Sequence, residues 1–244
     1  PVDGVSPMQK LQMTTQEGEN VAVCAIHGNF DDAQSAVKSI FTNDEIKAEL
    51  AKKNMMFSSA NSINWGRLVP QIVYYFSAYA DLCKMGQLQV GEPMNVVVPT
   101  GNFGNILAAW YAKQIGVPIE RLLCASNDNR VLTDFINTGT YDISDREFIL
   151  TSSPSMDILV SSNLERQLFE LTGRNGEAIR QWMADLADAR CFRVDAETFR
   201  RVRENFSADS VDNATCLATI REVLDAHDYL LDPHTAVAYA AAQN

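Results

Sequence analysis

Short apolar runs alternate along this chain with segments in which apolar side chains recur every three or four positions. The periodic segments predict helices, because that spacing places apolar residues on one face. The longest of them carries Leu68, Ile72, Tyr75, Phe76, Tyr79 and Leu82. The runs predict buried strands at Asn20–Ile26 and Val96–Val98, a short strand at Met55–Phe57 and a parallel strand at Arg121–Ala125. Strands that alternate with helices predict an α/β fold with an open, mostly parallel sheet and flanking helices.

Polar residues indicate where several helices begin. Asn43 and Asp232 have side chains that cap the first free N–H groups of a helix, and Pro70 fits a first turn, where its missing N–H costs nothing. The second half of the chain is expected to be mainly helical. Further helices are expected at 5–13, from 43 to about 53, from 154 to about 173, and at 177–187, 196–205, 213–227 and 234–243.

The most informative stretch joins the strand at Val96–Val98 to a helix over residues 106–115. A strand, a glycine-containing turn and a helix start form a device for holding an anion, because the first N–H groups of a helix have no intrahelical partner. Gly101 and Gly104 permit unusual backbone angles and close approach of a ligand. The spacing is neither the dinucleotide-binding G-x-G-x-x-G pattern nor a P-loop. A phosphate cradle and a tight turn without a ligand both remain open.

Arg67 indicates a second anion site at the start of the long helix. A cation at a helix N-terminus is unfavourable for the helix dipole, and an anionic ligand would remove that penalty. Ser62 and Asn64 are nearby polar partners. The alternative is a surface arginine in an ordinary salt bridge.

Other polar residues carry weaker signals. His27 follows a predicted strand and is either a catalytic base or, more commonly, a structural residue. His234 is either a pocket residue or a first-turn surface group. Ser126 and Asn127 follow the strand at Arg121–Ala125, so they are either part of a pocket wall at the carboxyl edge of the sheet or ordinary turn residues.

Composition excludes several classes of protein. With 244 residues, 46% of them hydrophobic, the chain can form a substantial core, and its net charge of −11 argues against a nucleic-acid surface. No apolar run approaches membrane-spanning length, and no signal-peptide pattern opens the chain. Its five cysteines lack zinc-ligand spacing and are expected to be free thiols, mostly buried, in a cytoplasmic protein. The chain starts without Met, which suggests a segment of a longer protein.

Several long strings, in order, resemble threonine synthase of the bacterial and fungal branch. They are SSANSINWGRLVPQIVYYF, VVVPTGNFGNILAAWYAK, RVLTDFINTGTYD, SPSMDILVSSNLERQLFEL and LLDPHTAVAYA. The resemblance implies a fold-type-II enzyme that uses pyridoxal 5′-phosphate to convert O-phospho-L-homoserine and water to L-threonine and phosphate. It implies that the cofactor phosphate is held by Gly101, Asn102, Phe103, Gly104 and Asn105. It also implies that Ser62, Asn64 and Arg67 hold the substrate phosphate.

The chain departs from the family in two places. No segment matches the N-terminal region with the Schiff-base lysine, and none matches the C-terminal segment that contacts the pyridine nitrogen. Residues 1–60 are therefore expected to be part of a small α/β lobe, and 61–244 an incomplete large domain that is inactive alone. The oligomeric state is open. Two rivals remain: another fold-type-II enzyme, such as a cysteine synthase or a serine/threonine dehydratase, and a non-catalytic domain that binds a phosphorylated ligand.

Overall fold

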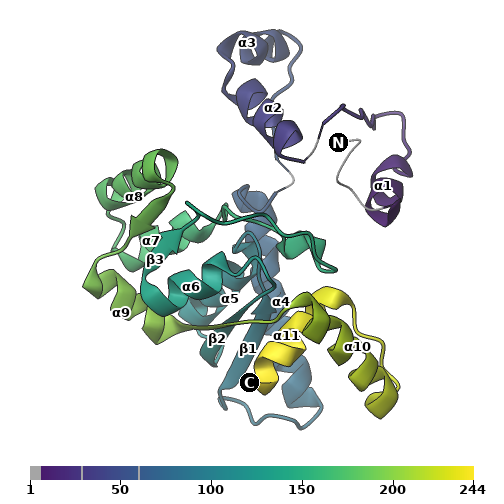
Figure 1. Ribbon diagram of the computed structural model, residues 1–244, viewed down its shortest axis with the longest axis vertical. Coiled ribbons are helices and arrows are strands. Elements are labelled where there is room, and N and C mark those ends of the chain that lie inside the picture. Colours follow the sequence, from purple (N-terminus) through teal and green to yellow (C-terminus); the bar gives the residue numbers. More distant parts are fainter. Residues whose placement is uncertain (1–6, 29, 60) are drawn as a thin grey trace. The chain divides into compact units, whose positions relative to one another are not determined.

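The computed structural model describes residues 7–28, 30–59 and 61–244. The chain divides into two compact units, Pro1–Ser58 and Ser59–Asn244 (Figure 1), and each is described by itself. That the two are lobes of one enzyme stays a prediction. Within the described residues, no helix is long and apolar enough to cross a membrane.

The first unit consists of three helices in its described part: α1 (Pro7–Thr14), α2 (Phe30–Thr42) and α3 (Asp44–Lys52). Asn43 caps α3 as predicted, because its side-chain oxygen accepts a hydrogen bond from the N–H of Ile46 at 3.0 Å. Phe41 stacks on Phe57 with ring centroids 4.7 Å apart. The first residues of the helix predicted over 5–13 lie outside the described residues.

The strands predicted at Asn20–Ile26 and Met55–Phe57 are wrong. Neither segment has regular structure, and the side chains of Val21 and Val23 are 45% and 50% exposed. An apolar run becomes a strand only when a neighbour takes its backbone hydrogen bonds and a second layer covers one face. The described part of this unit contains no partner strand.

The second unit is built on a parallel sheet in the order β1-β2-β5. Its strands are β1 (Met94–Pro99), β2 (Ile119–Ser126) and β5 (Phe206–Ser210). The first two confirm the predicted strands, whereas β5 was not predicted. Because the strands are parallel and in register, their carboxyl ends meet at one edge, where Thr100 N–H donates to the carbonyl of Ala125 at 2.8 Å.

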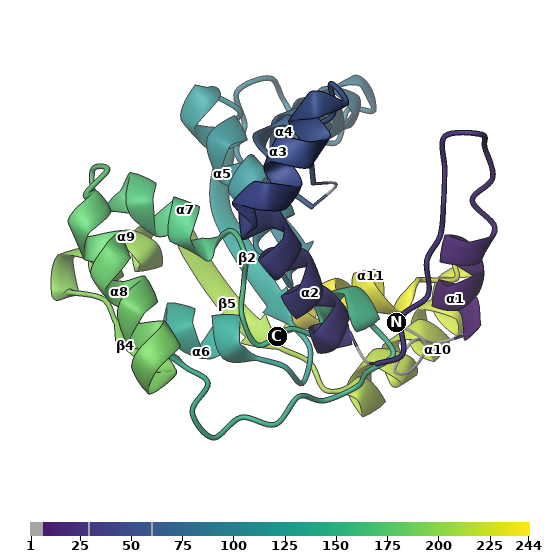
Figure 2. The same ribbon diagram turned by 90° about the horizontal axis from the view of Figure 1, so that it is seen from above.

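The two faces of this sheet bury different helices. Alternate residues of a strand point to opposite faces. Val98, Leu122 and Cys124 join the cluster that contains α5 (Gly104–Ile115), onto which α4 (Trp65–Lys84) packs. Val97, Leu123 and Ala125 join the cluster that contains α10 (Asn213–His227) and the alanine-rich α11 (Pro233–Gln243). Figures 1 and 2 show the resulting three layers.

A smaller helical layer lies beside the sheet and was only partly predicted. It holds α6 (Val131–Thr138), α7 (Leu164–Leu171), α8 (Gly176–Ala189) and α9 (Ala196–Asn205), with the antiparallel pair β3 (Thr140–Asp142) and β4 (Cys191–Arg193). Tyr141 stacks on Phe192 at 5.3 Å inside it. Burial raises the pKa of Tyr141, whose hydroxyl donates to the carbonyl of Leu159 at 2.8 Å.

Two helix predictions require correction. The helix expected over residues 154–173 is a short 3₁₀ turn, η1 (Pro154–Met156), then irregular chain, then α7. In this region side chains accept hydrogen bonds from backbone N–H groups. The carboxylate of Asp157 accepts from the N–H of Thr151, and the hydroxyl of Tyr141 accepts from the N–H of Ser161. Pro70 lies at the sixth residue of α4 rather than in its first turn, because Asn64 caps the helix at Trp65.

Candidate anion-binding site

The turn between β1 and α5 presents a row of unused backbone donors. Phe103 has a left-handed backbone, with φ at 60°, and its side chain is 1% exposed. Among the described residues, no hydrogen bond uses the N–H groups of residues 101–105. Buried N–H groups are nearly always paired, so a run of unused donors at a helix start fits a bound anion.

The two glycines of this turn are required for space rather than for unusual angles, which corrects the sequence interpretation. Neither has a positive φ. A Cβ on Gly101 would lie 2.6 Å from the carbonyl oxygen of Ser155. A Cβ on Gly104 would lie 2.7 Å from the Cβ and 2.9 Å from the Oγ of Ser62. The turn is therefore packed against two other segments with no room for a methyl group.

Asn163, the residue before α7, holds the turn from the other side. Its backbone N–H and its side-chain amide both donate to the carbonyl oxygen of Asn102, at 3.1 and 3.0 Å. The peptide bond after Asn102 is planar and trans, so its N–H points opposite to its carbonyl. Asn163 therefore fixes the direction of the N–H of Phe103, which points away from Asn163.

The side chain of Asn105 is held by two residues of α4. Its oxygen accepts from the hydroxyl of Tyr75 at 2.6 Å, and its nitrogen donates to the side-chain oxygen of Gln71 at 3.1 Å. Burial raises the pKa of Tyr75, which keeps its hydroxyl protonated as a donor. Asn105 keeps its backbone N–H and the second hydrogen of its side-chain amide for a ligand.

The second predicted site is a cavity of about 280 Å³ at the start of α4. Arg67, the third residue of this helix, contributes the cation, and the described lining contains no carboxylate. Ser62 lines the cavity and also touches Gly104, so it stands between the cavity and the turn. The described lining consists of Ser62, Gly66, Arg67, Pro70, Gln71 and Tyr74.

Asn64 has a structural task in this arrangement. Its side-chain oxygen accepts from the N–H of Gly66 at 3.0 Å, and its side-chain nitrogen donates to the carbonyl of Ser59 at 2.9 Å. It sets the start of α4, and with it the position of Arg67. Direct contact of Asn64 with a ligand stays a prediction.

Arg166 on α7 supports the loop that carries Ser62. Its guanidinium donates to the carbonyl of Ser62 at 3.1 Å, to the carbonyl of Ile63, and to the side chain of Asn163 at 3.3 Å. The start of α7 thus holds both the turn and the Ser62 loop. The sequence interpretation missed Asn163, Arg166, Gln71 and Tyr75. Local spacing could have found Gln71, which lies four residues after Arg67 on α4, whereas no local spacing relates the other three to either site.

Of the four remaining candidates, Asn127 and His234 make hydrogen bonds that support the segment next to Gly101. Asn127 donates to Thr151 at 2.9 Å and Asp157 at 2.7 Å, which anchors the segment that packs on Gly101. His234 accepts from the N–H of Ser155 at 3.2 Å, with its other ring nitrogen 3.2 Å from Asp232, so it supports the same segment. The Oγ of Ser126 is buried and has no partner among the described residues, and His27 is exposed.

The chain is similar to known proteins over nearly its whole length. No family model matches the chain. It is 44% identical to "Threonine synthase-like 1" of Homo sapiens over 243 residues, 99% of this chain and 33% of that protein. It is 40% identical to threonine synthase of Pseudomonas aeruginosa over 246 residues, 100% of this chain and 49% of that protein.

Solved structures of threonine synthases show the relationship most clearly. PLP-bound threonine synthase from Brucella melitensis superposes with a TM-score of 0.86 at 41% identity, over 98% of this chain and 49% of that one. Throughout its length, this chain is homologous to threonine synthases. Threonine synthase from yeast also superposes, with a TM-score of 0.85 at 36% identity, over 100% of this chain and 48% of that one. This threonine synthase homologue has their fold-type-II architecture and spans about a third to a half of its relatives' length.

Proposed function

We propose that this chain carries the two phosphate-binding sites of a threonine synthase. The reaction is the conversion of O-phospho-L-homoserine and water to L-threonine and phosphate, with pyridoxal 5′-phosphate as cofactor. The observation that supports this proposal is the contact between Ser62 and Gly104, because it brings two anion sites together. An enzyme whose cofactor and substrate both carry a phosphate requires such a pair.

The residues of the turn fit the cofactor phosphate. Residues 101–105 offer unused N–H groups at the start of α5, where the helix dipole favours negative charge. In this proposal the donors come from Gly101, Asn102, Phe103, Gly104 and Asn105 through their backbone. When bound, pyridoxal phosphate supplies an electron sink for bond cleavage in the amino-acid substrate.

The residues of the cavity fit the phosphate of O-phospho-L-homoserine. Arg67 would pair with it through two parallel N–H groups, and Ser62 would donate one hydrogen bond. The first turn of α4 contributes its dipole, and Asn64 sets where that turn begins. The substrate phosphate would then offset the unfavourable position of a cation at a helix start.

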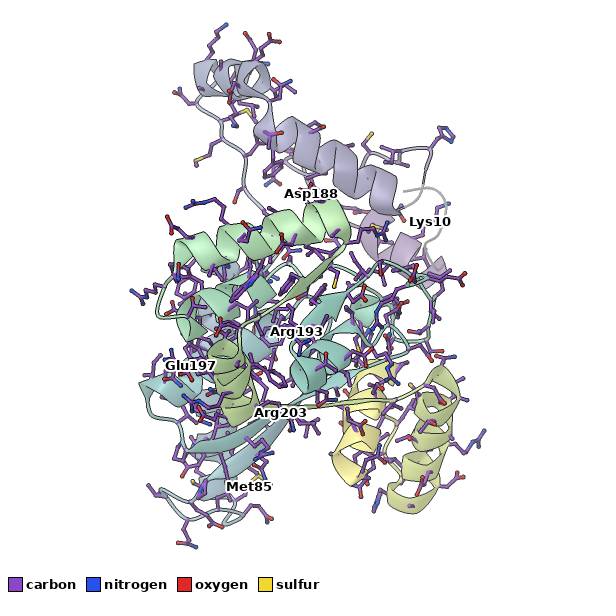
Figure 3. The ribbon with its side chains drawn as sticks, turned by 60° about the vertical axis from the view of Figure 1, so that its left-hand side comes forward. Lys10, Met85, Asp188, Arg193, Glu197 and Arg203 are labelled. Carbon is purple, nitrogen blue, oxygen red and sulfur yellow. The ribbon has the colours of Figure 1, made fainter. Side chains whose placement is uncertain are left out.

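The test uses the parent protein at full length, because this chain covers at most about half of its relatives. Loaded with pyridoxal phosphate, the parent should release phosphate from O-phospho-L-homoserine. Arg67→Ala should raise the KM for this substrate at least tenfold. Arg203→Ala, which removes an exposed arginine of α9 (Figure 3), should leave the KM unchanged.

Three results would contradict the proposal, and each points to a different alternative. Substrate binding that survives Arg67→Ala, together with activity on an amino acid without phosphate, would favour another fold-type-II lyase. Binding of the phosphorylated substrate without release of phosphate would favour a non-catalytic binding domain. Failure to bind pyridoxal phosphate would remove the cofactor assignment. A cytoplasmic location stays a prediction.

A further inference from the structure

Gln71 makes hydrogen bonds to both anion sites with one side chain. It lies on α4 one turn after Arg67 and is half-buried. Its nitrogen donates to the Oγ of Ser62 at 2.9 Å and to the carbonyl of Arg67 at 2.6 Å. Its oxygen accepts from the side chain of Asn105 at 3.1 Å. A single amide group therefore connects the cavity at Ser62 with the turn at Asn105.

The orientation of this amide follows from its neighbours. A backbone carbonyl only accepts, so the atom of Gln71 that faces the carbonyl of Arg67 must be the NH₂ group. The same NH₂ group faces Ser62, whose hydroxyl oxygen therefore accepts. The hydroxyl proton of Ser62 is then available to donate to another acceptor, such as an oxygen of a phosphate.

Asn105 is held in a matching orientation. Its nitrogen donates to Gln71, and its oxygen accepts from Tyr75. Asn105 is also the second residue of α5, so its side-chain position is tied to the helix start that offers the unused N–H groups. A change at Gln71 would disturb both ends of this hydrogen-bonded series.

We propose that Gln71 is a positioning residue that orients the hydroxyl of Ser62 towards the phosphate of the substrate and links that site to the cofactor turn. This inference rests on the proposed function. Gln71 acts through Ser62 and Asn105 and needs no contact with the substrate. Its removal should weaken phosphate binding in the cavity, with a smaller effect on the rate of the bound complex.

The test measures binding of inorganic phosphate to the full-length, pyridoxal-phosphate-loaded parent by calorimetry, together with KM and kcat for O-phospho-L-homoserine. Gln71→Met keeps the length of the side chain and removes its hydrogen bonds. We expect it to raise the Kd for phosphate and the KM about tenfold, and to change kcat less than threefold. Gln71→Glu should raise the phosphate Kd and the KM further, because a carboxylate would accept the hydroxyl proton of Ser62 and repel the phosphate.

A double-substitution cycle separates positioning from a general structural effect. If Gln71 acts through Ser62, Gln71→Met should cost little more phosphate affinity once Ser62→Ala is present. Gln181→Met on α8, an exposed glutamine that bonds Asp185, is the matched control and should leave Kd and KM unchanged.

The outcomes also separate this inference from the proposed function. Two results would overturn the role of Gln71 while leaving the threonine synthase assignment intact. One is an unchanged phosphate Kd in Gln71→Met. The other is a loss of phosphate affinity on Gln71→Met that is the same with and without Ser62→Ala. If the unsubstituted parent binds no phosphate, the cavity assignment and the role of Gln71 fall together. Release of phosphate from O-phospho-L-homoserine would then show whether the enzyme assignment survives.

Discussion

Asn163 donates two hydrogen bonds to the carbonyl oxygen of Asn102, one from its backbone at 3.1 Å and one from its side chain at 3.0 Å. These residues are 61 positions apart in the sequence. Because a peptide group is rigid, holding this carbonyl also sets the direction of the next N–H, which belongs to Phe103. The start of α7 therefore orients a backbone donor of the turn that we propose holds the cofactor phosphate.

Asn163→Ala should weaken cofactor binding. It removes the side-chain donor and keeps the backbone one, so we expect a stability loss of about 1 kcal/mol and a three- to tenfold higher Kd for pyridoxal phosphate. Asn175→Ala is the control, because Asn175 caps α8 on the surface and its loss also costs about 1 kcal/mol. Spectroscopic titration of the parent with pyridoxal phosphate measures the difference. Equal Kd values in the two variants would contradict this role of Asn163.

Gly104→Ala should disrupt the turn and the Ser62 loop together. The added methyl group would meet the Cβ of Ser62 at 2.7 Å, and such overpacking costs about 1–3 kcal/mol. We expect a lower unfolding midpoint and loss of both cofactor and phosphate binding. Gly176 also begins a helix, but a Cβ added there would meet no atom within 4 Å, so Gly176→Ala should be neutral or stabilising by up to about 1 kcal/mol. Normal binding by Gly104→Ala would show that the contact with Ser62 can relax.

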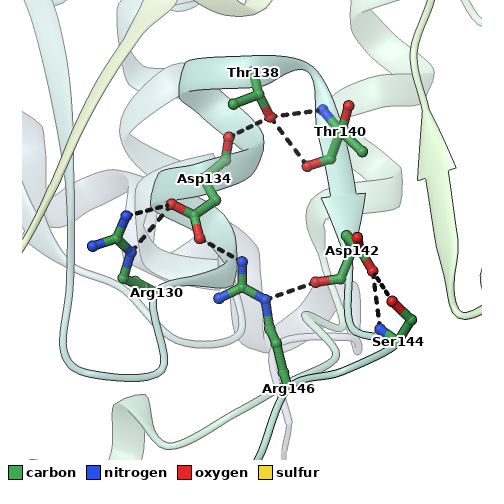
Figure 4. A network of polar contacts seen from close by, with 7 residues as sticks. All are labelled: Arg130, Asp134, Thr138, Thr140, Asp142, Ser144 and Arg146. Atoms are coloured by element: carbon green, nitrogen blue, oxygen red, sulfur yellow. Dashed lines mark hydrogen bonds and ion pairs between the residues drawn. The ribbon is translucent and has the colours of Figure 1, made fainter.

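Asp134 should contribute to stability in a pH-dependent way. Burial acts to raise its pKa, but hydrogen bonds and charges from Arg146 and Arg130 outweigh burial and hold the pKa below its ordinary value (Figure 4). A carboxylate with a lowered pKa stabilises the fold above the ordinary carboxyl pKa of about 4, and this stabilisation is lost as the pH falls through the folded-state pKa.

Unfolding of Asp134→Asn at two pH values tests this. At pH 7 the variant should be less stable by about 1 kcal/mol, and the difference should shrink towards zero as the pH falls through the lowered folded-state pKa of Asp134. Asp188→Asn, at an exposed position on α8 (Figure 3), should stay within about 0.5 kcal/mol of the unsubstituted protein at both pH values. A difference for Asp134→Asn that is the same at both pH values would argue against the ion pairs as its cause.

The cysteines should differ sharply in reactivity. Burial raises the pKa of Cys124 to about 12, and burial with the charges of Asp232 and Asp128 raises that of Cys216. Cys24 is exposed. Because the thiolate is the reactive form, an alkylating reagent at pH 8 should label Cys24 first and reach Cys124 and Cys216 only on unfolding. Mass spectrometry after short labelling measures this, and rapid labelling of Cys124 would contradict its burial.

Three segments show where reasoning from the sequence succeeds and where it fails. The run Val96–Val98 predicts β1 because its side chains are strongly apolar and β-branched. The strand β5 has the sequence FSADS, which lacks such a run, and it is a strand because β2 pairs with it. The opposite error occurs at Asn20–Ile26, an apolar run without a partner strand in the described part of its unit.

The sequence alone determined the elements that depend on neighbouring residues: the helical periodicities, the caps at Asn43 and Asp232, and a glycine turn with free N–H groups before α5. These are local, since helix caps and turn donors involve residues within about four positions. Only the tertiary structure decided which side chains hold the site. Gln71 meets Asn105 from 34 positions away, and Arg166 meets Ser62 from 104 positions away. Such hydrogen bonds exist only after the helices have packed, because nothing in the local sequence brings their partners together.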